Sequence, residues 1–203
     1  MNKKRWMAGM LALVALAMAV GAWGRTQAPS EAQSQTKPQA KGEQHVKVPV
    51  IPARPEDVSS PEAIVLADYE CISGGVGVAR QWARDLSLYD ANARFFVTEK
   101  DEKTGGLKVW SPSWQEFTDR TDEEITKGGF VEHEVGHKIY RYGNVATVFS
   151  SYEGKKMSTG EIFGRGVNIY QVYFAGGRWW ISSVSWDVEH AINEIPADLL
   201  PAK

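Results

Sequence analysis

Cysteine and net charge are both scarce in this sequence, and each shortage excludes a class of protein. Cys71 is the only cysteine among 203 residues, so no intramolecular disulfide can form and packing must stabilise the fold. The formal net charge of -2 leaves no basic surface of the kind that binds nucleic acid. The sequence also lacks a catalytic triad, a nucleophile motif, a phosphate loop and a metal-ligand cluster, so we expect no cofactor and no metal.

The first 24 residues have the three parts of a bacterial-type signal peptide. Residues 3–5 are basic, residues 7–22 are uncharged and apolar, and residues 22–24 place small side chains around a large one. Signal peptidases require that last pattern. We therefore expect cleavage near Gly24 and export to the periplasm or the cell exterior. An uncleaved segment is the alternative, and it would be the only contact of the chain with a membrane.

The rest of the chain divides into a polar segment and an aromatic-rich segment. Pro, Gln, Ala and Lys dominate residues 25–58, and such a segment buries too little apolar surface to fold. We expect it to be a disordered linker. Hydrophobic residues make up 43% of the whole chain, which has eight tryptophans. This content supports one compact domain over residues 59–203.

Within residues 59–203, helical signals come first and strand signals follow. Ser60 and Pro61 suit a helix start, and Ser113 with Glu116 has the capping-box spacing. We expect three helices: one that starts at Ser60, one over 79–93 and one over 113–125. Residues typical of strands, with turn residues between them, predict an antiparallel meander over 130–142, 144–152, 165–174 and 178–188. This order predicts an α+β fold.

Segments spread over residues 59–201 together resemble the SnoaL-like proteins of the NTF2-like superfamily, closest to an uncharacterised exported subgroup. The order and spacing of these segments carry the resemblance: 72–82, 86–97, 129–132, 143–153, 165–171 and 176–187. It implies an α+β cone with N-terminal helices packed in a curved antiparallel sheet, a pocket at the open end, and frequent dimerisation through the sheet. It implies no single chemistry, because isomerases, dehydratases, cyclases and binding modules share this fold.

Residues 133–137 read His-Glu-Val-Gly-His, the H-E-x-x-H pattern of zinc metalloproteases. That chemistry needs a helix, which places both histidines on one face with the glutamate beside them. The β-branched and aromatic residues around Gly136 favour a strand instead. On a strand the two histidines lie about 13 Å apart, too far for one zinc ion. We therefore interpret the motif as a chance match.

Acid–base groups inside the cone would serve an enzyme of this fold. A carboxylate in an apolar pocket has a raised pKa and can transfer protons. The candidates for such a role are Glu132, His133, Tyr69 and Asp187. A solvated strand face or an ion pair explains these residues as well. The candidates for lining a ligand pocket are Trp82, Tyr89, Trp114 and Phe117, although a plain core explains them equally.

The absence of a catalytic motif makes binding of a small apolar ligand in the cone the first functional expectation. An isomerase or dehydratase that uses acid–base residues of the pocket is one alternative. A protein-interaction module that dimerises through its sheet is another.

Large apolar groups on both faces of the last strand predict a homodimer. Strict alternation places Trp179, Ile181 and Ser183 on one face and Trp180, Val184 and Trp186 on the other. A partner subunit would cover the second face. Two features could remove this need: a bulge within 182–185 would move Trp186 to the first face, and residues 191–201 could fold back over the sheet.

Export can be tested on the mature protein. Mass spectrometry should find an N-terminus near Arg25, because the first 24 residues have the composition that signal peptidase recognises. Recovery of intact Met1 from a soluble cytoplasmic fraction would contradict this prediction.

Overall fold

The computed structural model describes residues 46–101 and 104–201. The expected signal peptide and residues 25–45 of the expected linker lie outside this part of the chain. Within the described ranges, no helix is long and apolar enough to span a membrane.

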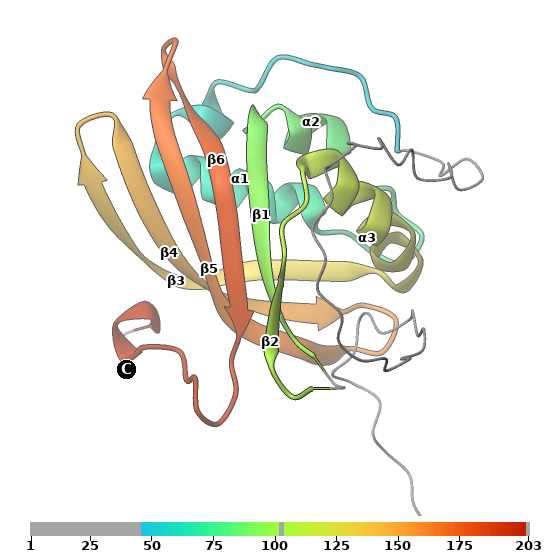
Figure 1. Ribbon diagram of the computed structural model, residues 1–203. Coiled ribbons are helices and arrows are strands. Elements are labelled where there is room, and N and C mark those ends of the chain that lie inside the picture. Colours follow the sequence, from blue (N-terminus) through green and yellow to red (C-terminus); the bar gives the residue numbers. More distant parts are fainter. Residues whose placement is uncertain (1–45, 102–103, 202–203) are drawn as a thin grey trace, which may run out of the picture. The chain divides into compact units, whose positions relative to one another are not determined.

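The three α-helices of the described chain lie on one side of a curved sheet and together they form an α+β cone, which confirms the expected fold class (Figure 1). The helical elements are η1 (Glu56–Val58), α1 (Pro61–Ile72), α2 (Trp82–Leu86), α3 (Trp114–Gly128) and η2 (Ala197–Leu199). The strands are β1 (Tyr89–Lys100), β2 (Leu107–Trp110), β3 (Phe130–Tyr142), β4 (Val145–Lys156), β5 (Glu161–Ala175) and β6 (Arg178–Val188).

The six strands form one sheet in the order β2-β1-β6-β5-β4-β3. From β3 to β6 each strand pairs antiparallel with the next, so the expected meander is confirmed. β1, however, pairs parallel with β6. The sheet is therefore mixed, and the expectation of a purely antiparallel sheet is wrong. A parallel pair cannot be joined by a tight turn, so no local turn signal in the sequence reveals it.

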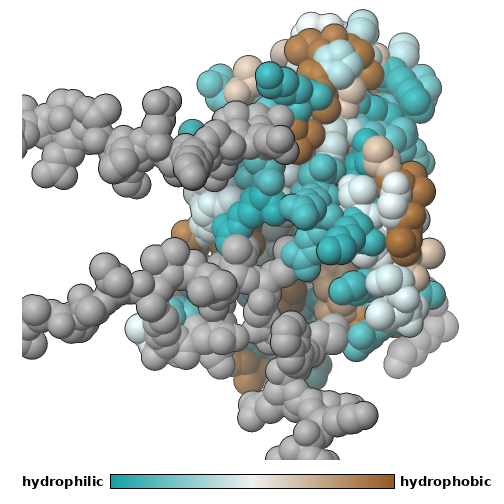
Figure 2. All heavy atoms as spheres, turned by 90° about the vertical axis from the view of Figure 1, so that its right-hand side faces the viewer, coloured by the Kyte–Doolittle hydropathy of each residue, from teal (hydrophilic) through white to brown (hydrophobic). Residues whose placement is uncertain are grey.

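Side-chain caps begin α1 and α3 where the sequence predicts them. Ser60 Oγ accepts a hydrogen bond from the Ala63 amide at 3.1 Å. Ser113 and Glu116 form a reciprocal capping box, in which Glu116 Oε2 accepts from the Ser113 amide at 2.7 Å. α3 buries one side and exposes charged residues on the other. Much of the visible surface on this side of the molecule is hydrophilic (Figure 2).

The helix expected over 79–93 is wrong beyond Leu86. α2 has five residues, and β1 begins at Tyr89. Within β1, buried Phe95 and Val97 alternate with an exposed Phe96, which is the period of a strand. β1 pairs with β6 on one side and with β2 on the other, so contacts with distant segments override the local helical pattern.

The alternation expected along β6 breaks at a β-bulge. The pairing register with β5 shifts by one residue at Ser182. Val184 and Trp186 therefore pack with the core, on the same side as Trp179 and Ile181. The homodimer was expected from a row of Trp180, Val184 and Trp186 on the second face. The bulge breaks this row, so the premise of that expectation is wrong.

The C-terminal segment covers part of the outer face of the sheet, on the side away from the α-helices, where η2 contacts β3 and β4. Ile195 and Leu199 are buried, and Ser151 Oγ donates to the Leu199 carbonyl at 2.5 Å. A hollow of about 360 Å³ remains between this segment and the sheet, with Phe149 and Ile169 among its lining residues. The folding back of residues 191–201 over the sheet was one of the two alternatives to a dimer, and the structure shows it.

Residues 46–58 pack against the domain, so the folded part begins before Ser59. Val46 and Val48 contact the core. The buried Asp57 carboxylate accepts hydrogen bonds from Arg84 Nε and Nη2, both at 2.7 Å. A bidentate pair of this kind holds η1 against α2.

Two strand glycines offer a matched test of the C-terminal cover. A Cβ on residue 136 would lie 2.6 Å from the Leu199 carbonyl oxygen, whereas one on residue 164 would meet no atom within 4 Å. Gly136→Ala should lower the free energy of unfolding by about 1–3 kcal/mol, because the segment must shift. Gly164→Ala should not lower it. Urea denaturation measures both, and equal stabilities would show that the segment does not press on β3.

Candidate functional site

Four adjacent strands contribute one row of side chains to the concave face of the sheet. Pairing places His137 of β3 opposite Ser150 of β4, Ser150 opposite Asn168 of β5, and Asn168 opposite Trp186 of β6. Directly paired residues point to the same side of a sheet. α1 lies against this side, and its Tyr69 reaches the row.

Glu132 and Tyr69 meet at one amide nitrogen. Asn168 Nδ2 donates to Glu132 Oε1 and to the Tyr69 hydroxyl, each at 3.1 Å. Glu132 Oε1 and the Tyr69 hydroxyl oxygen are therefore separated by at most twice that distance. Ser73 Oγ accepts from the Glu132 amide at 2.9 Å and donates to its carbonyl at 3.0 Å, which fixes this part of β3 next to the end of α1.

Further hydrogen bonds connect Tyr69 to the surface of the domain. The Tyr69 hydroxyl lies 2.8 Å from Ser150 Oγ, and Ser150 Oγ donates to Glu134 Oε2 at 2.6 Å. Glu134 Oε1 lies 2.6 Å from His137 Nδ1. A continuous chain of contacts therefore connects the side chains of Tyr69, Ser150, Glu134 and His137. We call it the hydroxyl chain.

Burial perturbs both groups that meet at Asn168. Desolvation raises the pKa of the Glu132 carboxyl from 4.5 to about 8, although the hydrogen bond from Asn168 opposes this shift. Desolvation also raises the pKa of Tyr69 well above 10.0, and the nearby charge of Glu132 adds to it. Near neutral pH a large fraction of Glu132 therefore keeps its proton, while Tyr69 is a hydroxyl. A carboxyl that titrates in this range is suited to acid–base work.

A second buried acid pair lies deeper in the core. Asp68 accepts hydrogen bonds from the Tyr89 and Tyr170 hydroxyls at 2.6 and 2.8 Å, and Asp85 accepts from Trp114 Nε1 at 2.6 Å. The two carboxyls are in hydrogen-bonding contact, and burial raises the pKa of both. Asp85 Oδ1 has no donor among the described residues. One proton shared between the carboxyls satisfies it.

The H-E-x-x-H residues lie on β3, so the expectation of a strand is confirmed. The register with β4 shifts at Val135, which is an extra residue on β3. His137 then points to the concave face with Glu134, whereas His133 pairs with Glu153 on the outer face. Among the described residues, no three His, Cys, Asp or Glu side chains are placed to hold a metal ion.

Three of the four expected pocket-lining aromatics are buried and hydrogen-bonded to carboxylates. Tyrosine and tryptophan side chains in a core usually form such hydrogen bonds through their polar atoms. The three bonds, from Trp82 to Asp122, from Tyr89 to Asp68 and from Trp114 to Asp85, are each 2.6 Å long.

Phe117, the fourth of these aromatics, is half-buried and lies beside Trp186. Their ring centroids are 5.7 Å apart, and Phe117 also stacks on Phe95 at 4.6 Å. Trp186 is half-buried as well and pairs across the sheet with Asn168. Phe117 and Trp186 therefore form an aromatic wall that ends next to the amide that holds Glu132 and Tyr69.

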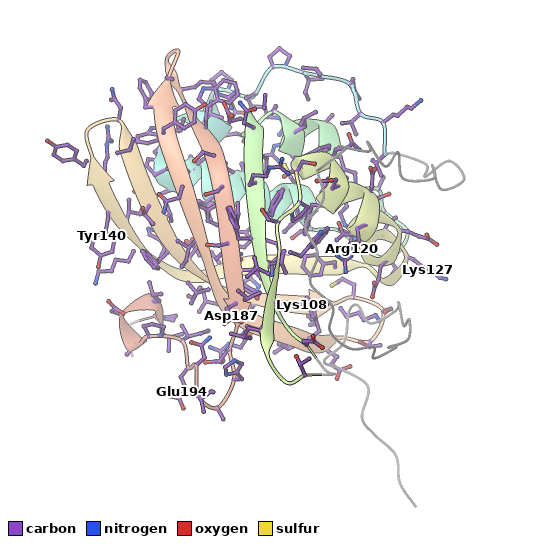
Figure 3. All side chains as sticks on the ribbon, in the orientation of Figure 1. Lys108, Arg120, Lys127, Tyr140, Asp187 and Glu194 are labelled. Carbon is purple, nitrogen blue, oxygen red and sulfur yellow. The ribbon has the colours of Figure 1, made fainter. Side chains whose placement is uncertain are left out.

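Of the four candidates for proton transfer, the structure brings Tyr69 and Glu132 together. His133 lies on the outer face, and Asp187 lies at the end of β6 beside the C-terminal segment, as Figure 3 shows. Ser150 and Asp85 belong to the buried clusters, but sequence reasoning did not select them. A serine in a strand and an aspartate in a short helix are typical of exposed positions, so neither carries a signal of its own.

The raised pKa of Glu132 predicts how one substitution changes stability with pH. Between pH 4.5 and about 8 the unfolded chain releases a proton that folded Glu132 keeps, so this group lowers the free energy of unfolding as pH rises. Glu132→Gln should therefore be more stable than the wild type, with a difference that grows over that range by at most about 1.4 kcal/mol per pH unit.

Thermal or urea unfolding across this pH range measures the difference. Glu123→Gln on the exposed side of α3 is the control. The contributions of Asp68 and Asp85 cancel because every variant keeps them. A difference between Glu132→Gln and the wild type that stays constant with pH would contradict the shifted pKa.

Comparison with known proteins finds only distant similarities in structure. No protein-family model matches the chain, and no curated protein matches it. An NTF2-like protein of unknown function from Pseudomonas putida KT2440 has 11% identity and a TM-score of 0.48, over 73% of this chain and 99% of the other. A protein of unknown function with a cystatin-like fold from Nostoc punctiforme has 11% identity and a TM-score of 0.45, over 65% and 95%.

A protein from Novosphingobium aromaticivorans, provisionally assigned as a scytalone dehydratase, has 15% identity and a TM-score of 0.41, over 54% of this chain and 72% of the other. At these identities a similarity in structure says nothing of the reaction. The described chain folds as an α+β cone, and its function has to be argued from its own side chains.

Proposed function

We propose that this domain binds a small molecule in its cone and transfers protons on it, as an enzyme of the isomerase or dehydratase type. The observation that carries the proposal is the meeting of Glu132 and Tyr69 at Asn168 Nδ2, at 3.1 Å each. One group is a carboxyl with a pKa near neutral and the other is a hydroxyl. A base and a proton donor therefore flank the same point.

The hydrogen bonds leave part of Glu132 free to react. Within the described residues, Asn168 is the one side chain that donates to its carboxyl, and Glu132 is only half-buried. Its Oε2 atom therefore remains able to accept a proton from a ligand. Asn168 keeps the other oxygen in place, which preorganises the base.

Elimination of water from a β-hydroxy carbonyl compound suits these two groups best. Glu132 accepts the proton from the carbon next to the carbonyl, and the carbon–carbon double bond forms as the carbon–oxygen bond breaks. Tyr69 gives its proton to the departing hydroxyl, which leaves as water. Glu132 is then protonated and Tyr69 is a tyrosinate, to which Asn168 still donates. An isomerase needs only one base, which returns the proton that it removes.

The surroundings favour a ligand with both an apolar and a polar part. Phe117 and Trp186 offer an aromatic wall, and the polar groups begin at the next strand with Asn168. A purely apolar ligand would leave Glu132 Oε2 without water or a hydrogen-bond partner, which costs free energy. For this reason we favour proton transfer over the simple binding of an apolar molecule.

The reaction can be tested with a β-hydroxy-β-aryl ketone, whose dehydration to the conjugated enone changes its ultraviolet absorbance. The wild type should catalyse the reaction, with a rate that rises with pH to a plateau above about 8 as Glu132 loses its proton. Glu132→Gln should lower the rate by about 100-fold or more, since it removes the general base. Tyr69→Phe should also lower it.

Glu123→Gln serves as the control, because it removes an exposed carboxylate of α3 outside the site. Turnover by Glu132→Gln at the wild-type rate would reject Glu132 as the base. A wild type that binds the ketone but never converts it would favour a binding function over an enzyme.

A further inference from the structure

We propose that Ser150, Glu134 and His137 carry protons from solvent to Tyr69. This inference rests on the proposed function, in which Tyr69 loses its proton to the departing hydroxyl at each turnover. The hydroxyl chain offers a route for its return that is separate from Glu132.

The hydroxyl chain leads from two buried hydroxyls through Glu134 to the more exposed His137. Tyr69 is 3% exposed and Ser150 is 0% exposed, whereas the Glu134 side chain is 13% exposed and the His137 side chain 37%. Each contact between neighbours is 2.8 Å or shorter. The chain therefore connects a buried hydroxyl to a side chain that water reaches, with no gap between hydrogen-bonded atoms.

The donors in this chain have a defined direction at rest. Ser150 has one hydroxyl proton and gives it to Glu134 Oε2, so the bond between Ser150 and Tyr69 uses the proton of Tyr69. Asn168 donates to the same Tyr69 oxygen. Once Tyr69 has lost its proton, its oxygen can only accept, and the Ser150 hydroxyl turns towards it.

Return of the proton then takes four transfers. Ser150 gives its proton to the tyrosinate, and Glu134 in its protonated form gives one to Ser150. Glu134 receives that proton from the imidazolium form of His137, which the ring reaches by taking a proton from hydronium or from a buffer acid. The chain thus takes up one proton from solvent for each proton that Tyr69 has given away, and Glu132 releases one proton to solvent before the next turnover. Ser150, Glu134 and His137 return to their starting charge states, so the cycle balances.

The β-bulge in β3 is what makes this route possible. Residues three apart on a regular strand point to opposite faces. The extra residue Val135 brings Glu134 and His137 to the same face, where they pair with Tyr152 and Ser150. The second histidine of the H-E-x-x-H sequence therefore belongs to a chain of proton carriers, and His133 on the outer face does not.

Transient kinetics of the β-hydroxy-β-aryl ketone separate proton return from the reaction itself. His137→Ala should form the first equivalent of enone at the wild-type rate, because Tyr69 is still protonated. Later turnovers should slow by about tenfold or more, as expected for the loss of a proton-transfer group. Imidazole added to the buffer should restore them. Glu134→Gln, which keeps the shape but cannot carry a proton, should show the same burst without rescue.

His133→Ala is the matched control, four residues away on the same strand and on its other face, and it should show no burst. A His137→Ala variant with unchanged steady-state turnover, or with a slowed first turnover, would overturn the proton route while the proposed function stands. A wild type that forms no enone at all would overturn the proposed function, and the proton route with it.

Discussion

Three carboxyl groups in one small core, two of them buried and one half-buried, impose the main constraint on this structure. Asp68, Asp85 and Glu132 all lie where water cannot solvate a charge fully, and a buried carboxyl needs hydrogen-bond donors. The donors come from elements far apart in the chain: β1, β5 and α3 supply Tyr89, Tyr170, Trp114 and Asn168. Because two of the three carboxyls are on α1 and α2, these bonds determine how the helices lie on the sheet.

Two β-bulges decide which side chains share the concave face with those carboxyls. A shift of one residue turns every following side chain to the other face. The bulge at Val135 brings His137 beside Ser150, and the bulge at Ser182 brings Trp186 beside Asn168. Without the bulges both residues would face the C-terminal segment, and the row that links a surface histidine to the aromatic wall would be broken.

These bulges also mark the limit of what the sequence could predict. Local signals were sufficient for the caps at Ser60 and Ser113, for the strand at the H-E-x-x-H residues and for the four-stranded meander. The parallel pairing of β1 and the face of Trp186 depend on contacts between distant segments. Tyr69 and Glu132 were chosen by residue type alone, and nothing local indicates that Asn168 joins them. The sequence therefore predicts the fold better than the site.

The carboxyl groups of the core differ in how many of their oxygens have a hydrogen-bond donor. This difference separates a structural role from a role in proton transfer. Asp68 accepts a tyrosine hydroxyl at each oxygen and shares a proton with Asp85. The hydrogen bonds within the core, including the one from Trp114 to Asp85, occupy both carboxyls, so neither offers a free oxygen to a ligand. Glu132 has one donor and keeps some exposure. It is the acid of the three that can react, because the contacts that hold it leave one oxygen free.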